Sequence, residues 1–162
     1  MDLIGERWSM PLIRELLLGP RRFSDLKTSL NGISANVLSQ RLDGLEKAGV
    51  LVRRKLPPPA SVQVYELTSW GYEASPIFQA LGRWAVRSPS HDPTRPFSPV
   101  SLMLSLRTML SATAAGDLEA SPSQIAAYIY AGAPLASLRV EGDLELAKRL
   151  PSYFPMPAKA AA

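Results

Sequence analysis

One stretch of the sequence restricts the fold more than any other: ISANVLSQRLDGLEKAGVLVRR, residues 33–54. Its leucines recur at spacings of four and three residues: Leu38, Leu42 and Leu45. This spacing predicts a helix over residues 34–48, with Ser34 as its N-cap and Gly49 as its terminator. The polar residues fall on the opposite side or close to it: Asn36, Ser39, Gln40, Asp43 and Lys47. We therefore expect the leucines to anchor the helix and its polar side to face outward.

The residues after this helix have the composition of a β-hairpin. The segment VLVRRKL is rich in β-branched and basic residues, and VQVYEL alternates apolar and polar residues as a half-buried strand does. Between them, PPPAS cannot lie inside a strand. We predict a hairpin over residues 51–67 with a proline-stiffened tip. The expected fold class is mainly α with this small hairpin, α+β.

Further helices are predicted before and after this pair of elements. Residues 2–18 have helical spacing interrupted at Ser9 and Met10, which indicates two helices, and residues 24–30 form a third, short one. A long helix is predicted over residues 68–88, with a bend at Pro76. Its apolar content is large for a helix at the edge of a small domain, which indicates burial by another chain.

Composition changes along the chain predict its division into parts. We expect a first domain over residues 1–88, a proline-rich linker over 89–99, a second region over 100–157 and a disordered tail over 158–162. The second region contains two helical segments, VSLMLSLRTMLSATAA and SPSQIAAYIYAG. Its last segment, ASLRVEGDLELAKRL, predicts a short strand, a turn and a small helix.

The residue types present exclude several kinds of chemistry. The chain has no cysteine and one histidine, His91, so neither thiol chemistry nor a metal site is expected. We find no pairing of a nucleophile with a base and no glycine-rich phosphate loop, and therefore expect neither an enzyme nor a cofactor. The sequence has no signal peptide and no apolar run of about 18 residues, which predicts a cytoplasmic protein without a membrane span.

The surplus of basic charge lies in the first domain. The formal net charge is +4. Through residue 88 there are 12 basic and 8 acidic side chains, and the remaining residues carry 6 of each. A surplus of this kind favours a polyanionic partner that docks on the first domain.

The polar side of the leucine-anchored helix carries groups that suit base edges. Amide side chains such as those of Asn36 and Gln40 can bond adenine N6 and N7 bidentately. The run of Arg53, Arg54 and Lys55 in the hairpin can neutralise phosphates beside the same groove. A polar helix face or a basic triplet is by itself more often merely solvated. The two in this order favour a recognition helix in the major groove of DNA.

The first half of the chain resembles a known family in four segments: GERW, GPRRFSDL, GISANVLSQRLDGLEKAGVLVRR and YELTSWG. In this order and at these separations they are similar to the HxlR-type winged helix-turn-helix transcriptional regulators. The resemblance implies a homodimeric repressor or activator, with the helix from Ser34 as reader and the 51–67 hairpin as wing. It also implies that the first and the fifth helix form the dimer contact. Many relatives sense oxidants through a cysteine, and this chain has none.

The resemblance also implies the residues of two sites. The DNA-binding residues would be Arg22, Ser34, Asn36, Ser39, Gln40, Arg41, Arg53, Arg54 and Lys55. The dimer interface would include Leu3, Ile4, Ile77, Leu81 and Trp84. Arg41 lies on the flank of the leucine side of its helix, so an internal ion pair or a backbone contact is as plausible for it as a base contact.

The second half resembles the sterol-carrier-like domain that some relatives append, in LSLRTML, ASPSQIAAYIYAGAPL and LRVEGDLELAKRLPSYFPMP. The strands of the sheet of that domain are missing between Ala115 and Ser121, which would leave an incomplete α/β appendage. Either the gene has lost the sheet, or the residues on the two sides of Gly116 are not adjacent in the natural protein. An appendage of this type could bind a small apolar effector. Its helical apolar residues could equally form a plain core: Met103, Leu106, Met109, Tyr128 and Tyr130.

Two functions from different classes therefore compete. The first is sequence-specific binding of a palindromic operator in double-stranded DNA by a homodimer, with half-sites about 10 bp apart. The second is a winged-helix module that contacts proteins without binding DNA.

Overall fold

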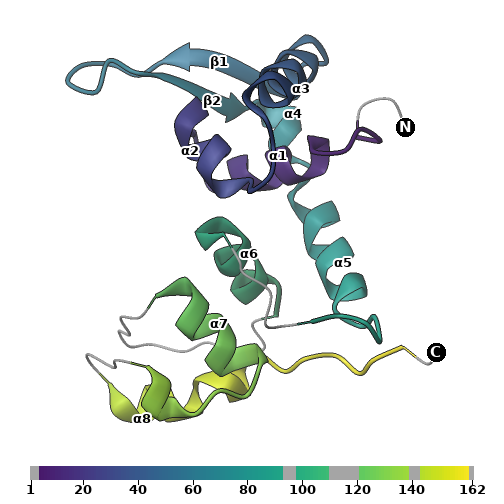
Figure 1. The fold of residues 1–162 in the computed structure, drawn as a ribbon, viewed down its shortest axis with the longest axis vertical. Coiled ribbons are helices and arrows are strands. Elements are labelled where there is room, and N and C mark those ends of the chain that lie inside the picture. Colours follow the sequence, from purple (N-terminus) through teal and green to yellow (C-terminus); the bar gives the residue numbers. More distant parts are fainter. Residues whose placement is uncertain (1–3, 93–97, 110–120, 139–142, 161–162) are drawn as a thin grey trace. The chain divides into compact units, whose positions relative to one another are not determined.

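The computed structural model describes residues 4–92, 98–109, 121–138 and 143–160 (Figure 1). The chain divides into two compact units, Met1–Phe78 and Gln79–Ala162. These are called the N-terminal and the C-terminal unit below. The division falls ten residues before the predicted domain end at 88, inside a helix.

Three helices build most of the N-terminal unit: α1 (Ser9–Leu16), α2 (Phe23–Ser29) and α3 (Ala35–Lys47). The helix predicted over residues 34–48 is confirmed almost to the residue. Ser34 precedes it in extended conformation, and its side chain accepts a hydrogen bond from the N–H of Val37 at 3.2 Å. Gly49 follows it with φ of 76°, a left-handed conformation that suits glycine and ends the helix.

The predicted hairpin is also confirmed. Strands β1 (Leu51–Lys55) and β2 (Gln63–Leu67) pair antiparallel, with Arg53 opposite Tyr65. The sheet has a further contact that the sequence pattern does not predict. The N–H of Arg21 donates to the carbonyl of Tyr65 at 2.9 Å, and the N–H of Tyr65 donates back at 2.8 Å. This bridge ties the segment between α1 and α2 to the outer side of β2.

One apolar core holds the helices and the hairpin of the N-terminal unit together. It joins leucines of all three helices to apolar residues of the hairpin and its approach: Leu12, Leu16, Leu26, Leu38, Leu42, Leu45, Val50, Leu51, Val64 and Leu67. Burying each such side chain stabilises a fold by about 1.5–3 kcal/mol relative to its exposure. In Figure 1, α3 lies beside β1, so the core fixes the helix and the hairpin as neighbours.

The prediction of one long helix over residues 68–88 was wrong. The structure has two helices, α4 (Ser69–Tyr72) and α5 (Ser75–Ala85), separated at Glu73 and Ala74. Pro76 lies in the first turn of α5, where its missing N–H is not needed, so the proline begins a new helix and does not bend a continuous one.

The helix expected before Ser9 is likewise not present over residues 4–8, which form turns and bends. Trp8 has φ of 92°, and a helix cannot continue through a residue in this left-handed conformation. Residues 2 and 3 of that predicted helix lie outside the described residues.

The regular elements described in the C-terminal unit are all helical. Its elements after α5 are α6 (Pro99–Met109), α7 (Pro122–Tyr130), the 3-10 turns η1 (Leu135–Ser137) and η2 (Leu150–Tyr153), and α8 (Leu144–Arg149). Ser121 caps α7 as the sequence predicts, with its side chain accepting from the N–H of Gln124 at 3.3 Å. The residues around Gly116, and part of the predicted strand, lie outside the described residues.

The apolar residues of the C-terminal unit pack on one another. Six of them form a buried cluster: Met109, Tyr128, Ile129, Leu138, Tyr153 and Phe154. Leu106 and Tyr130 pack against this cluster, whereas Met103 is exposed. Burial raises the pKa of Tyr130, whose hydroxyl accepts a hydrogen bond from Ser105 at 3.1 Å.

Part of the tail predicted to be disordered makes hydrogen bonds. The N–H of Ala160 donates to the carbonyl of Arg87 at 2.7 Å, and Lys159 Nζ donates to the carbonyl of Val86 at 2.8 Å. Both carbonyls belong to residues just beyond the end of α5, where backbone acceptors have no partner within the helix.

Candidate nucleic-acid interface

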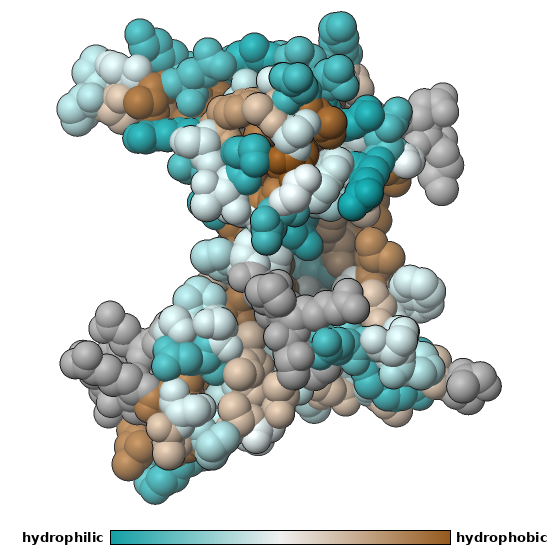
Figure 2. All heavy atoms as spheres, in the orientation of Figure 1, coloured by the Kyte–Doolittle hydropathy of each residue, from teal (hydrophilic) through white to brown (hydrophobic). Residues whose placement is uncertain are grey.

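The outer side of α3 presents the polar groups that the sequence predicts. Leu38 and Leu42 have no exposed surface, whereas Asn36, Ser39 and Gln40 are all exposed. Figure 2 shows hydrophilic residues along the edge of the N-terminal unit that α3 and β1 form. The helix therefore offers two amides and a hydroxyl to a partner while its leucines hold it in the core.

Arg41 forms the internal ion pair that was one of the alternatives for it. Its Nη2 lies 2.8 Å from Oε2 of Glu6, and its side chain is only 28% exposed. The guanidinium thus pairs with a carboxylate of the segment before α1 and does not extend from the outer face of α3. Ser34 has the role of an N-cap described above, and its side chain lies at the same exposed end of the helix.

Arg53 is held by carboxylates of α3. Its Nη2 donates to Asp43 Oδ1 at 2.5 Å and to Glu46 Oε2 at 2.9 Å. Its guanidinium carbon also lies 5.3 Å from the centre of the Tyr65 ring, within reach of a cation–π contact. The hydrogen bond to Asp43, more than any other interaction, raises the pKa of Arg53. The guanidinium is therefore charged, and it is hydrogen-bonded to the two carboxylates.

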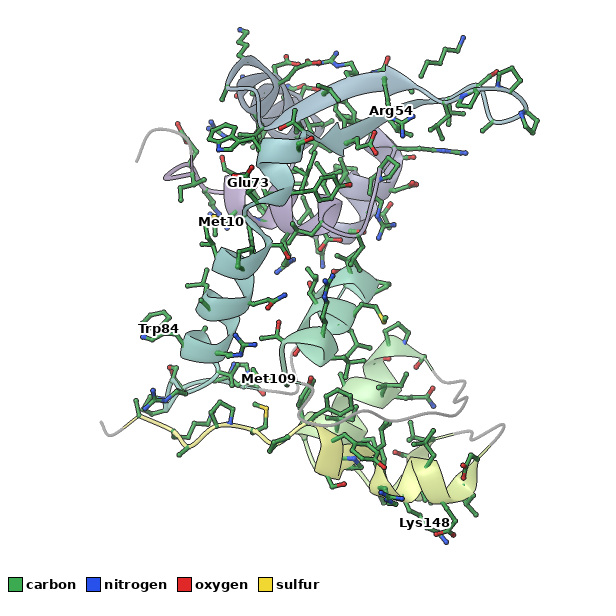
Figure 3. The ribbon with its side chains drawn as sticks, turned by 180° about the vertical axis from the view of Figure 1, so that it is seen from behind. Met10, Arg54, Glu73, Trp84, Met109 and Lys148 are labelled. Carbon is green, nitrogen blue, oxygen red and sulfur yellow. The ribbon has the colours of Figure 1, made fainter. Side chains whose placement is uncertain are left out.

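Arg54 is paired in the same way on the other side of the strand. Its Nε donates to a carboxylate oxygen of Glu66 on β2, and this hydrogen bond raises the pKa of Arg54. Figure 3 shows Arg54 on the hairpin. Lys55, the third residue of the basic triplet, is exposed and forms no ion pair with any residue that the structure describes.

Arg22 lies at the start of α2, away from the basic triplet in sequence. Its backbone N–H donates to Asp25 Oδ2 at 3.4 Å, which closes the first turn of α2, and its residue is exposed. The structure thus places Arg22, Asn36, Ser39, Gln40 and Lys55 at exposed positions, and it pairs the other three arginines with carboxylates.

The carboxylates that pair with these arginines were not predicted from the sequence. Asp43 was assigned only to the outer side of the helix, and Glu46 and Glu66 were given no role. A signal was present, since residues three apart on a helix are neighbours and Asp43 and Glu46 have this spacing. Their partner lies seven to ten residues away on a strand, and helix periodicity does not report on such a pair.

The predicted dimer residues on α5 form an exposed apolar stripe. Ile77, Leu81 and Trp84 are 59%, 43% and 72% exposed, and they follow one another at spacings of four and three residues. None of the α5 side chains, all of which are described, is buried. Figure 3 shows Trp84 projecting from the helix. Ile4 is 37% exposed, and Leu3 lies outside the described residues.

The described residues contain neither a metal-type cluster nor a membrane-spanning helix. No group of three or more histidine, aspartate or glutamate side chains there is arranged to hold a metal ion. None of the described helices is both long and apolar enough to cross a bilayer.

The sequence of the N-terminal half is similar to a known protein family. Residues 3–92 match the model of the HxlR-like helix-turn-helix family. The chain is 37% identical over 86 residues to YvaP of Bacillus subtilis, an uncharacterized HTH-type transcriptional regulator, covering 52% of this chain and 79% of YvaP. It is 34% identical over 84 residues to the HTH-type transcriptional regulator YodB of the same organism, covering 52% and 75%.

A solved structure gives the same result for the fold. The reduced form of YodB from B. subtilis has a TM-score of 0.50 and 32% identity to this chain, covering 56% of this chain and 89% of YodB. These matches confirm the resemblance seen in the first half, and they show nothing of a sterol-carrier-like second half. With the exposed polar face of α3 beside the hairpin, they establish that the chain belongs to the HxlR-like helix-turn-helix family of DNA-binding transcriptional regulators, which are not enzymes.

Proposed function

We propose that the protein is a homodimeric, sequence-specific regulator that places α3 in the major groove and the hairpin on the phosphate backbone. The observation that carries this proposal is the face of α3, which exposes Asn36, Ser39 and Gln40 while burying the leucines behind them. The width of the major groove admits such a helix, and amides there read adenine. The half-sites would lie about one helical turn apart.

Gln40→Ala is expected to lower affinity for the operator by about tenfold or more, because a bidentate amide–base pair is worth about 1–3 kcal/mol. Affinity for unrelated duplexes should stay unchanged, because Gln40 carries no charge. The measurement is fluorescence anisotropy on a duplex selected from a random library by the wild-type protein. Gln79→Ala removes an amide from α5 and should change neither affinity.

If the wild-type protein selects no sequence from the library, the proposed function fails. The competing reading, a winged-helix module that contacts proteins only, would then stand. If Gln40→Ala lowers affinity equally for the operator and for unrelated duplexes, Gln40 does not recognise a base.

Lys55 is proposed as a phosphate contact of the wing, since its charge is not balanced by a carboxylate of the described residues. Lys55→Ala should weaken binding to all duplexes and reduce the slope of log K against log salt by about 0.9 per subunit. The matched control, Arg54→Gln with Glu66→Gln, removes a pair of zero net charge and should leave the slope unchanged. A slope that falls equally in both proteins would contradict the assignment.

The apolar stripe of α5 supports the proposed homodimer. A stripe of Ile77, Leu81 and Trp84 exposed to water is unfavourable in a monomer, and a two-fold axis allows two copies of one such helix to cover each other. A dimer also provides the two α3 helices that a palindromic operator needs.

The apolar residues considered for an effector pocket are proposed to form the structural core of the C-terminal unit. Met109 and Tyr128, two of the residues considered for a pocket lining, are buried within the cluster of the unit, and Met103 faces solvent. This packing supports the second of the two readings that the sequence left open.

A further inference from the structure

We infer that Arg53 is a positioning residue for DNA binding: together with Asp43 and Glu46 it forms an ionic clamp that holds strand β1 of the wing against the reader helix. The inference rests on the proposed function in one respect, that α3 and the hairpin bind the same duplex. It departs from the prediction that Arg53 tracks phosphate.

The geometry joins three elements through one side chain. The Nη2 atom of Arg53 donates to Asp43 at 2.5 Å and to Glu46 at 2.9 Å, so two consecutive turns of α3 contact one atom of β1. The backbone N–H of Arg53 donates to the other carboxylate oxygen of Glu46 at 3.2 Å. Glu46 therefore grips the strand at both its side chain and its main chain.

The other face of the guanidinium lies over β2. Its carbon is 5.3 Å from the ring centre of Tyr65, and Tyr65 is buried and bonded through its own backbone to Arg21. Arg53 thus lies between α3 and a side chain that is fixed on its far side. Because bonds on several sides restrict the arginine, it has little freedom to reach a phosphate.

The local charge also argues against a phosphate contact. One guanidinium faces two carboxylates, so the cluster has a net charge of −1 and repels a phosphate backbone. Carboxylates near DNA weaken binding unless they provide something else. Here they fix the distance between the wing and the helix. A fixed spacing lets both elements bind one duplex without the entropy cost of ordering the wing on binding.

The clamp has a further effect on the strand itself. β1 is an edge strand of a two-stranded sheet. The N–H groups of an edge strand that point away from its partner strand are open to pairing with another chain. The carboxylate of Glu46 occupies the N–H of Arg53 and so covers this edge at its centre.

The experiment compares Asp43→Asn, Arg53→Gln and a control, Glu73→Gln, which removes an exposed carboxylate between α4 and α5. Asp43→Asn should weaken operator binding by about two- to fivefold per subunit, which is the range of one exposed ion pair. The sign is decisive, because loss of a negative charge that had no positioning role would strengthen binding. Arg53→Gln should weaken binding with an unchanged salt slope. Glu73→Gln should change neither.

Two outcomes would overturn the clamp. The first is a gain in affinity in Asp43→Asn. The second is a fall of about 0.9 per subunit in the salt slope in Arg53→Gln, which is the signature of one lost phosphate contact in each subunit. Thermal melts of each variant show whether it remains folded.

A measurement without DNA separates this inference from the proposed function. Deuterium exchange at the backbone N–H of Arg53 should become faster in Asp43→Asn and in Glu46→Ala, because the clamp protects that group. Unchanged exchange would contradict the clamp even if the protein binds its operator. Faster exchange in a protein that selects no operator would support the clamp while the proposed function fails.

Discussion

Replacing Gly71 by alanine is expected to destabilise the winged-helix fold by about 3 kcal/mol, at the upper end of overpacking effects. A Cβ at Gly71 would lie 2.2 Å from the carbonyl oxygen of Val50 and 3.1 Å from Cβ of Leu67. The carbonyl of Val50 cannot easily withdraw, because it accepts hydrogen bonds from the N–H of Thr68 at 3.0 Å and from its hydroxyl at 3.2 Å. Chemical denaturation followed by circular dichroism measures the change.

Gly44→Ala is the matched control for this prediction. Gly44 also lies in a helix, α3, and a Cβ there would meet no atom within 4 Å. Alanine at such a position stabilises a helix by about 0.5–1 kcal/mol. If the free energy of unfolding falls in Gly71→Ala and rises in Gly44→Ala, the close contact of α4 with Val50 is the cause of the destabilisation. Changes of the same sign would contradict this explanation.

The double variant Leu81→Asp and Trp84→Asp is expected to produce a monomer and to reduce operator affinity by about 100-fold or more. Two linked DNA-binding domains bind about 10²–10⁴ times more tightly than one, because the second domain binds intramolecularly once the first is bound. Carboxylates in the α5 stripe would repel the same carboxylates of the second subunit, and burying them in the interface would cost free energy. Sedimentation equilibrium gives the oligomeric state, and anisotropy on the selected duplex gives the affinity.

Met103→Asp controls for the introduction of a charge at an exposed apolar position. Met103 on α6 is 55% exposed, comparable with the residues of the stripe. This variant should remain dimeric and keep its affinity. A wild-type monomer, or a double variant that stays dimeric, would rule out α5 as the interface.

The reader helix and its polar face could be predicted from the sequence because their causes are local. Leucine spacing, the Ser34 cap and Gly49 act within one or two helical turns. The hairpin was predictable for a similar reason, since the prolines at its tip are excluded from strand interiors and the flanking β-branched residues favour strands. The exposed positions of Asn36 and Gln40 then followed from the burial of the leucines opposite them.

Local patterns failed where a distant contact decided the conformation. The segment over 68–88 has helical spacing throughout, but the structure places Gly71 against the carbonyl of Val50 and begins a new helix around Pro76. In the same way, Trp8 adopts a left-handed conformation inside an amphipathic pattern. The roles of the arginines likewise depended on contacts between different elements, which helix and strand periodicity do not report.

Short-range periodicity and burial specify helix α3, the hairpin and the polar side that faces outward, so these features follow from the amino-acid sequence. Which charges remain available at that surface follows from the packing of the elements. This packing pairs Arg41 with Glu6, Arg53 with α3 and Arg54 with Glu66, and it leaves Lys55 without a carboxylate among the described residues. An ion pair forms wherever folding brings two flexible side chains within about 4 Å, and that distance is set by packing between elements and not by their order along the chain.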